Sequence, residues 1–272
     1  MTLRSFIDDA GPPTQTIAVV SEDASGSGPL EEMLAETFED QPIAVEADVT
    51  LDGDTDAPPA VADALAADGD TAVLLEDGEP VAASPMLKLY DSLLAINSDL
   101  FVTGARGVGE IEFPDVLAGL EGTRLRLRGY PLAHKEKLLL ILVSRHIEQR
   151  AWAAGSGTLH SAFQDLSRID DEIGTYETYD ALADTDVDVH VYGAESGGDG
   201  ATTDLDVTEH TGTDAAYRDG WFVVFEPDDR APADAEGCAL VCLETEPRIW
   251  HGFWTTDPQR VTRIESYVAR EL

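Results

Sequence analysis

Basic residues are scarce in this chain of 272 residues, and lysine is the scarcest. Only 17 residues are lysine or arginine, against 54 aspartates and glutamates, so the formal net charge is −37 at pH 7. A surface of this sign repels phosphates, which argues against a nucleic-acid partner. Because 43% of the residues are hydrophobic, the charge does not indicate disorder. Acidic, lysine-poor sequences are typical of folded proteins from halophilic cells, where concentrated salt screens the repulsion between carboxylates.

Cysteine is almost as rare, with only Cys238 and Cys242 in the chain. They lie four residues apart in apolar, strand-like sequence, where a bond between them would need distortion. We therefore expect buried free thiols in a reducing compartment. Pairing of either thiol with His251 as nucleophile and base stays an alternative, disfavoured by the apolar neighbours. The histidines show no metal-ligand spacing, so we predict no metal and no cofactor.

Long hydrophobic runs are also missing. Residues 138–143 form an apolar run of six residues, whereas a membrane-spanning helix needs roughly 20. Residues 1–15 contain no hydrophobic segment typical of a secretion signal. We therefore expect a cytoplasmic protein that does not contact a membrane.

The apolar run lies in the middle of a long helix predicted over residues 131–154. Pro131 suits a first helical turn, and Gly155 suits the left-handed conformation that follows many helices. Because residues 138–143 are apolar on every side, the helix must be covered on several faces, by its own sheet or by a second subunit. We predict a homodimer contact through Leu139 and Leu142.

The rest of the chain predicts an α/β (α+β) fold, with a mixed β-sheet flanked by helices. Residues 1–125 are interpreted as an unassigned α/β segment, and residues 126–272 as a module that includes the long helix. Residues 194–219 are polar and predicted to form a mobile loop. Strands are predicted at residues 17–20, 43–45, 71–75, 80–83, 100–102, 124–128, 158–163, 187–192, 221–225, 239–243 and 249–254. Further helices are predicted at residues 2–10, 29–38, 61–67, 85–98, 174–184 and from 258 to the end.

Two local patterns have more than one interpretation. Residues 104–109 are glycine-rich but lack the Lys-Ser/Thr of a phosphate loop, so we expect a surface turn. Residues 124–150 contain seven bases and two acids, against the trend of the chain. They could form an anion site or partner surface, but neutralisation of nearby carboxylates is the favoured interpretation.

Residues 144–261 contain seven segments of distinctive sequence: SRHIEQRAWAAG (144–155), LHSAFQ (159–164), ETYDALADTD (177–186), VDVHVYG (187–193), GWFVVFEPD (220–228), CALVCLE (238–244) and HGFWTTDPQRV (251–261). Through these segments, residues from about 130 to 270 resemble the DICT sensory domain of two-component and cyclic-dinucleotide signalling proteins. The whole chain resembles stand-alone haloarchaeal members of this group. The resemblance implies signal input rather than catalysis, with the output in a separate protein.

Strand alternation suggests where a ligand would bind. It places Trp250, Gly252 and Trp254 on one face of a strand, with the glycine leaving room for a ring. It also places Tyr192 on the same face as His190. The alternative for all these side chains is core packing. The predicted ligand-binding residues are His190, Tyr192, Trp221, Trp250 and Trp254.

Together these patterns favour a non-enzymatic cytosolic sensor that binds a small molecule or a signalling protein. The long helix would transmit the change, with His146 among its signal-helix candidates. The alternative function is a histidine phosphotransfer or kinase-like protein in which His146, in SRHIEQ, accepts phosphate. A kinase would also need the Asn and Gly-rich boxes of an ATP-binding domain, and nothing after residue 155 supplies them.

Overall fold

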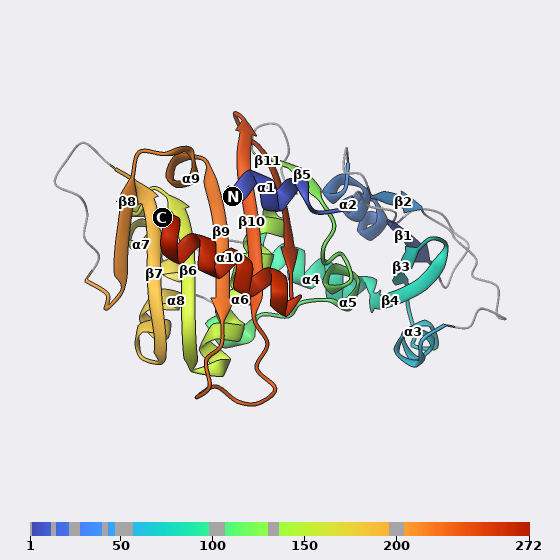
Figure 1. The fold of residues 1–272 in the computed structure, drawn as a ribbon. Coiled ribbons are helices and arrows are strands. Elements are labelled where there is room, and N and C mark those ends of the chain that lie inside the picture. Colours follow the sequence, from blue (N-terminus) through green and yellow to red (C-terminus); the bar gives the residue numbers. More distant parts are fainter. Residues whose placement is uncertain are drawn as a thin grey trace.

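A mixed sheet of seven strands forms the larger part of the structure (Figure 1). The computed structural model describes residues 2–11, 15–21, 28–39, 43–46, 57–97, 107–129, 136–195 and 204–272. Strand β7 pairs in parallel with its two neighbours, and the other pairs are antiparallel. The strand order is β5 (Leu125–Arg128), β11 (Ile249–Thr255), β10 (Cys238–Glu246), β9 (Gly220–Glu226), β6 (Ser156–Gln164), β7 (Asp186–Ala194) and β8 (Thr208–Gly212).

Helices cover both faces of this large sheet. The long helix α6 (Glu136–Ala154) packs on one face together with α7 (Ser167–Asp171) and α8 (Ile173–Ala183) (Figure 1). The last helix, α10 (Pro258–Glu271), and the first, α1 (Leu3–Asp8), lie side by side on the opposite face. The two ends of the chain therefore meet on the same surface of the sheet.

A second, smaller sheet is formed by the amino-terminal part of the chain. Its strand order is β2 (Ala44–Glu46), β1 (Gln15–Val20), β3 (Thr71–Glu76) and β4 (Glu79–Pro85). One face packs on α2 (Pro29–Thr37), α4 (Met86–Asn97) and α5 (Asp115–Ala118), and the other packs on α3 (Pro59–Leu65). Helix α4 and the short helix η1 (Val108–Glu110) also contact α6. One continuous hydrophobic core therefore joins the two sheets.

Local sequence signals explain the ends of the two most regular helices. Gly155 follows α6 with φ +66°, a left-handed conformation that costs glycine little. At the start of α10, the Asp257 carboxylate accepts a hydrogen bond from the Arg260 N–H at 2.9 Å, and Pro258 occupies the first turn. Both helix boundaries agree with the sequence.

The predicted fold class is confirmed: two mixed sheets are flanked by helices, with α6 as the long helix. The expected loop over residues 194–219 is wrong in its described part, which contains β8 and α9 (Ala215–Arg218). Residues 100–102, 104–106 and 131–135 lie outside the described residues, and so do the predictions made for them. The division of the chain at residues 125 and 126 stays a prediction. None of the described helices is both long and apolar enough to cross a membrane.

Candidate functional site

A cavity of about 140 Å³ lies between α6, the strands β6 and β9, and the segment that contains α7 and α8. Helix α6 contributes Ile141, Ser144, Arg145 and Glu148 to its wall. This spacing of three, one and three residues places all four side chains on one helix face. The long helix therefore presents both an apolar and a charged group to the same space.

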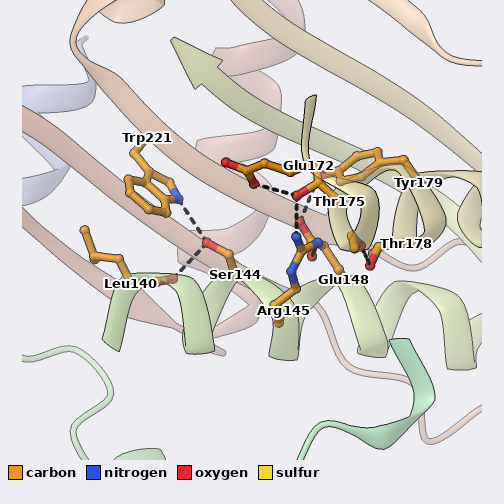
Figure 2. A network of polar contacts seen from close by, with 10 residues as sticks. Leu140, Ser144, Arg145, Glu148, Glu172, Thr175, Thr178, Tyr179 and Trp221 are labelled. Carbon is orange, nitrogen blue, oxygen red and sulfur yellow. Dashed lines mark hydrogen bonds and ion pairs between the residues drawn. The ribbon is translucent and has the colours of Figure 1, made fainter. Parts of the chain in front are cut away.

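An ion pair within α6 forms the charged part of the wall. Arg145 Nη1 lies 2.7 Å from Glu148 Oε2, and the side chains are only 9% and 4% exposed. Both partners are also held by α8: Arg145 Nη2 donates to Thr175 Oγ1 at 2.6 Å, and Tyr179 Oη donates to Glu148 Oε1 at 2.9 Å (Figure 2). A buried ion pair needs such additional hydrogen bonds to compensate for desolvation.

The network continues to both sides of the ion pair (Figure 2). The Thr175 hydroxyl donates to Glu172 Oε2 at 2.9 Å. On the other side, Trp221 Nε1 donates to Ser144 Oγ at 3.0 Å, and Ser144 Oγ donates to the Leu140 carbonyl at 2.9 Å. The polar edge of the indole is thus fixed to α6, and its ring closes one side of the cavity.

Tyr179 is fully buried beneath this network. Burial, and then the neighbouring Glu148 carboxylate, raise the pKa of its hydroxyl well above the ordinary value. The Tyr179 hydroxyl therefore stays protonated and keeps its hydrogen bond to Glu148. The wall does not change its charge through this group at neutral pH.

Residues 121–244 match the family model for DICT, described as the sensory domain in diguanylate cyclases and two-component system. The match supports a DICT-domain protein. All residues that line the cavity fall within the matched range. No curated protein and no solved structure matched the chain.

Among the predicted ligand-binding residues, Trp221 lines the cavity of the DICT-matched region. Trp250 packs edge-to-face against Trp221, with ring centroids 6.4 Å apart, and Trp254 packs against Phe113 at 5.4 Å. Both of these tryptophans are buried in the core on the α6 side of the sheet. Neither lines the cavity.

The room expected beside Gly252 is filled. A Cβ atom at this position would overlap the sulfur of Cys242 and the carbonyl oxygen of Val241. Because Gly252 has no side chain, the Cys242 side chain and the backbone of β10 pack closely against β11. It does not leave space for the ring of a ligand.

His190 and Tyr192 lie on the opposite, α10 face of the sheet, in a cluster of imidazole and phenol groups. Tyr192 Oη lies 2.8 Å from His160 Nδ1, and His190 Nδ1 lies 3.0 Å from His210 Nε2. The rings of His160 and His190 stack at 4.8 Å. The structure thus divides the five predicted ligand-binding residues between two faces of the sheet.

No group of His, Cys, Asp and Glu side chains in the described ranges is arranged to hold a metal ion.

Leu139 and Leu142, predicted to form a dimer contact, are each 2% exposed. They belong to the core that α6 shares with the large sheet and with the amino-terminal elements α4 and η1. The chain itself therefore covers the apolar middle of α6. This corrects the expectation that Leu139 and Leu142 provide a surface for a second subunit.

His146, the residue of the phosphotransfer alternative, stacks on Phe113 with ring centroids 4.3 Å apart. Its buried Nδ1 has no hydrogen-bond partner among the described residues. Burial, and then the nearby Arg150 charge, lower the pKa of His146 to about 4. A phosphoacceptor imidazole must be exposed to a partner, so this packing disfavours the phosphotransfer alternative.

The two thiols are buried and free, and their surroundings do not favour the thiolate form that a nucleophile needs. Burial raises the pKa of Cys238 to about 12 and raises that of Cys242 as well. His251 pairs across the strands with Leu243, which packs on the α10 face, whereas Cys242 packs on the α6 face. Cys242 and His251 therefore lie on opposite sides of the sheet.

Carboxylates neutralise several of the bases in residues 124–150. Arg124 lies 3.6 Å from Asp8, and Arg128 lies 3.3 Å from Glu39. Together with the Arg145–Glu148 pair, these contacts support the interpretation that the bases neutralise carboxylates, and they do not support an anion site along β5.

The buried pair of Arg145 and Glu148 was not predicted from the sequence. The available signal was an arginine and a glutamate three residues apart between the core residues of α6.

Proposed function

We propose that this chain is a non-enzymatic sensory protein that binds a small molecule in the cavity beneath α6. The observation that carries the proposal is the cavity itself, which lies within the DICT-matched region and has a buried, hydrogen-bonded charge pair in its wall. Pockets that combine apolar walls with a few fixed polar groups are typical of small-molecule sites. The DICT description as a sensory domain supports the same role.

The position of α6 supports a route for the signal. One face of the helix lines the cavity, and other parts of the helix pack on α4 and η1 of the amino-terminal part. A ligand that shifts α6 would therefore repack the interface with those elements. A protein partner that reads this change would be a separate signalling protein.

Cavity-filling variants test the proposal. We expect ligand-observed NMR to detect binding from a set of neutral, anionic and cationic single-ring compounds. Ile141→Trp fills the cavity from α6 without removing a hydrogen bond, and should abolish that binding. Val223→Phe fills it from β9 and serves if the first variant does not fold. The matched control is Ile173→Trp, at an α8 position that is 57% exposed, which should bind like the wild type.

Two results would overturn the proposal. One is that no compound of the set binds the wild-type protein. The other is that both folded cavity-filling variants bind the compounds as well as the wild type does.

We also propose that the protein works in the salt-rich cytoplasm of a halophilic cell, as a haloarchaeal stand-alone DICT protein. The net charge of −37 and the low lysine content support this proposal. Repulsion among so many carboxylates destabilises the folded state unless it is screened.

A further inference from the structure

The cavity wall has more hydrogen-bond donors than its own contacts use. Arg145 donates to Glu148 and to Thr175, and a guanidinium carries further N–H groups beyond these two contacts. Arg145 is buried and lines the cavity, so its remaining donors have little access to bulk water. A ligand with hydrogen-bond acceptors would satisfy them.

A second guanidinium, that of Arg168 on α7, lines the same cavity. Its side chain makes no hydrogen bond or ion pair with any residue that the structure describes. A guanidinium that lines a pocket and has no hydrogen-bond partner is suited to bind a carboxylate, because it can donate two parallel hydrogen bonds to the two carboxylate oxygens.

The acceptors of the wall are more fully engaged. Both oxygens of Glu148 accept hydrogen bonds, from Arg145 and from Tyr179. Glu172 accepts from Thr175. The charges of the two arginines and the two glutamates balance, but the unused hydrogen-bonding capacity of the arginines consists entirely of donors. The wall therefore favours an acceptor-rich group over an ammonium group.

The size and the apolar walls of the cavity limit the rest of the ligand. Its volume of about 140 Å³ is close to that of a cavity of about 150 Å³ known to hold benzene in another protein. Ile141, Phe163 and Val223 supply apolar surface, and Trp221 supplies an aromatic ring. One ring, or a branched hydrocarbon group of that size, fits this space.

We propose that the cavity binds a small monocarboxylate whose apolar part is about the size of one six-membered ring. Arg168, with the unused donors of Arg145, holds the carboxylate, and the ring lies among Ile141, Phe163 and Val223. This inference rests on the proposed function, because it names the ligand class of the same cavity.

Three probes that each carry one phenyl ring and a small polar group test the ligand class: benzoate, benzamide and benzylammonium. We expect isothermal titration at high salt to show benzoate binding about tenfold or more tightly than benzamide, because a charge-assisted hydrogen bond is roughly twice as strong as a neutral one. Benzylammonium should not bind. High salt is needed because the net negative charge of the protein repels an anion at long range.

Two arginine variants test the residue assignment. Arg168→Gln should weaken benzoate binding about tenfold and leave benzamide binding within about twofold. The matched control is Arg218→Gln, an exposed position on α9 outside the cavity, which removes the same charge from the whole protein. It should leave the affinity for benzoate unchanged.

The outcomes separate this inference from the proposed function. If benzamide or benzylammonium binds as tightly as benzoate, and Ile141→Trp abolishes that binding, the cavity is a ligand site but the carboxylate class is wrong. If Arg168→Gln and Arg218→Gln weaken benzoate binding equally, the assignment of Arg168 is wrong. If no probe binds the wild-type protein, both proposals fail.

Discussion

Removal of the Glu148 carboxylate tests how the charges beneath α6 are held. In Glu148→Ala, the Arg145 guanidinium, in a side chain 9% exposed, keeps its charge but loses its carboxylate, and Tyr179 loses the acceptor of its hydroxyl. Leaving one member of a buried ion pair without its partner costs about 3–5 kcal/mol. We therefore expect the free energy of unfolding to fall by about 4 kcal/mol. At roughly 2–4 °C per kcal/mol for a chain of this size, the midpoint of thermal unfolding falls by about 8–16 °C.

The exposed pair of Arg150 and Glu236 provides a matched control. Its N···O distance is also 2.7 Å, but the Glu236 side chain is 67% exposed. Glu236→Ala should cost less than about 1 kcal/mol, because solvent screens an exposed pair and replaces its contacts. Urea unfolding at one fixed salt concentration, followed by tryptophan fluorescence, compares the two variants.

A double variant separates the cost of an unpaired charge from the value of the pair. In Arg145→Met with Glu148→Met both charges are removed, so no unpaired ion stays buried, and most of the loss should be recovered. The reasoning fails if Glu148→Ala and Glu236→Ala lose the same stability. It also fails if the double variant is no more stable than Glu148→Ala.

Two further predictions concern pH and salt. Burial, and then the neighbouring His190 and His210, lower the pKa of His160 to about 4, so between pH 6.5 and 4 the unfolded chain binds more protons at this site. Urea unfolding measured across pH should show that the free energy of unfolding contributed by His160 is fully present above about pH 6.5 and falls by about 3 kcal/mol toward pH 4. If His160→Gln shows the same fall, His160 is not its cause. The free energy of unfolding should also rise steadily from about 0.1 M to about 3 M KCl as carboxylate repulsion is screened, and a flat response would argue against the halophilic proposal.

The elements that the sequence predicted well have strong local signals. In β7, Val187, Val189 and Val191 alternate with polar residues and pack on the α6 face, as the period of two requires. The start of α10 has its own cap in Asp257. Strand β8 carries no such signal, because Thr208–Gly212 is polar and lies at the edge of the sheet. It is a strand through its pairing with β7, which only the folded chain provides.

The candidate site was less accessible from the sequence, because its residues acquire their role from distant segments. The prediction relied on aromatic residues, but of the three predicted tryptophans only Trp221 lines the cavity, and Trp250 and Trp254 are core residues. The sequence predicted that the bases of residues 124–150 neutralise nearby carboxylates, but it did not predict that Arg145 pairs with Glu148 in a buried position. Their burial depends on α8, whose Tyr179 lies 31 residues further along the chain than Glu148. No local pattern in the sequence of α6 indicates that α8 buries these two side chains.

The folded unit around the cavity extends beyond the DICT-matched residues. Strand β11, after the matched range, lies between β10 and β5, so β5 has its sheet partner only when β11 is present. Glu121, at the start of the range, accepts hydrogen bonds from Thr255 and Thr256 just before α10. A ligand of the proposed kind would therefore act on α6 within a sheet that is completed by later residues. It can shift α6 only by its difference in affinity for the two positions of the helix. With both sheets packed on one continuous core, such a shift would be transmitted through the contacts of α6 with α4 and η1.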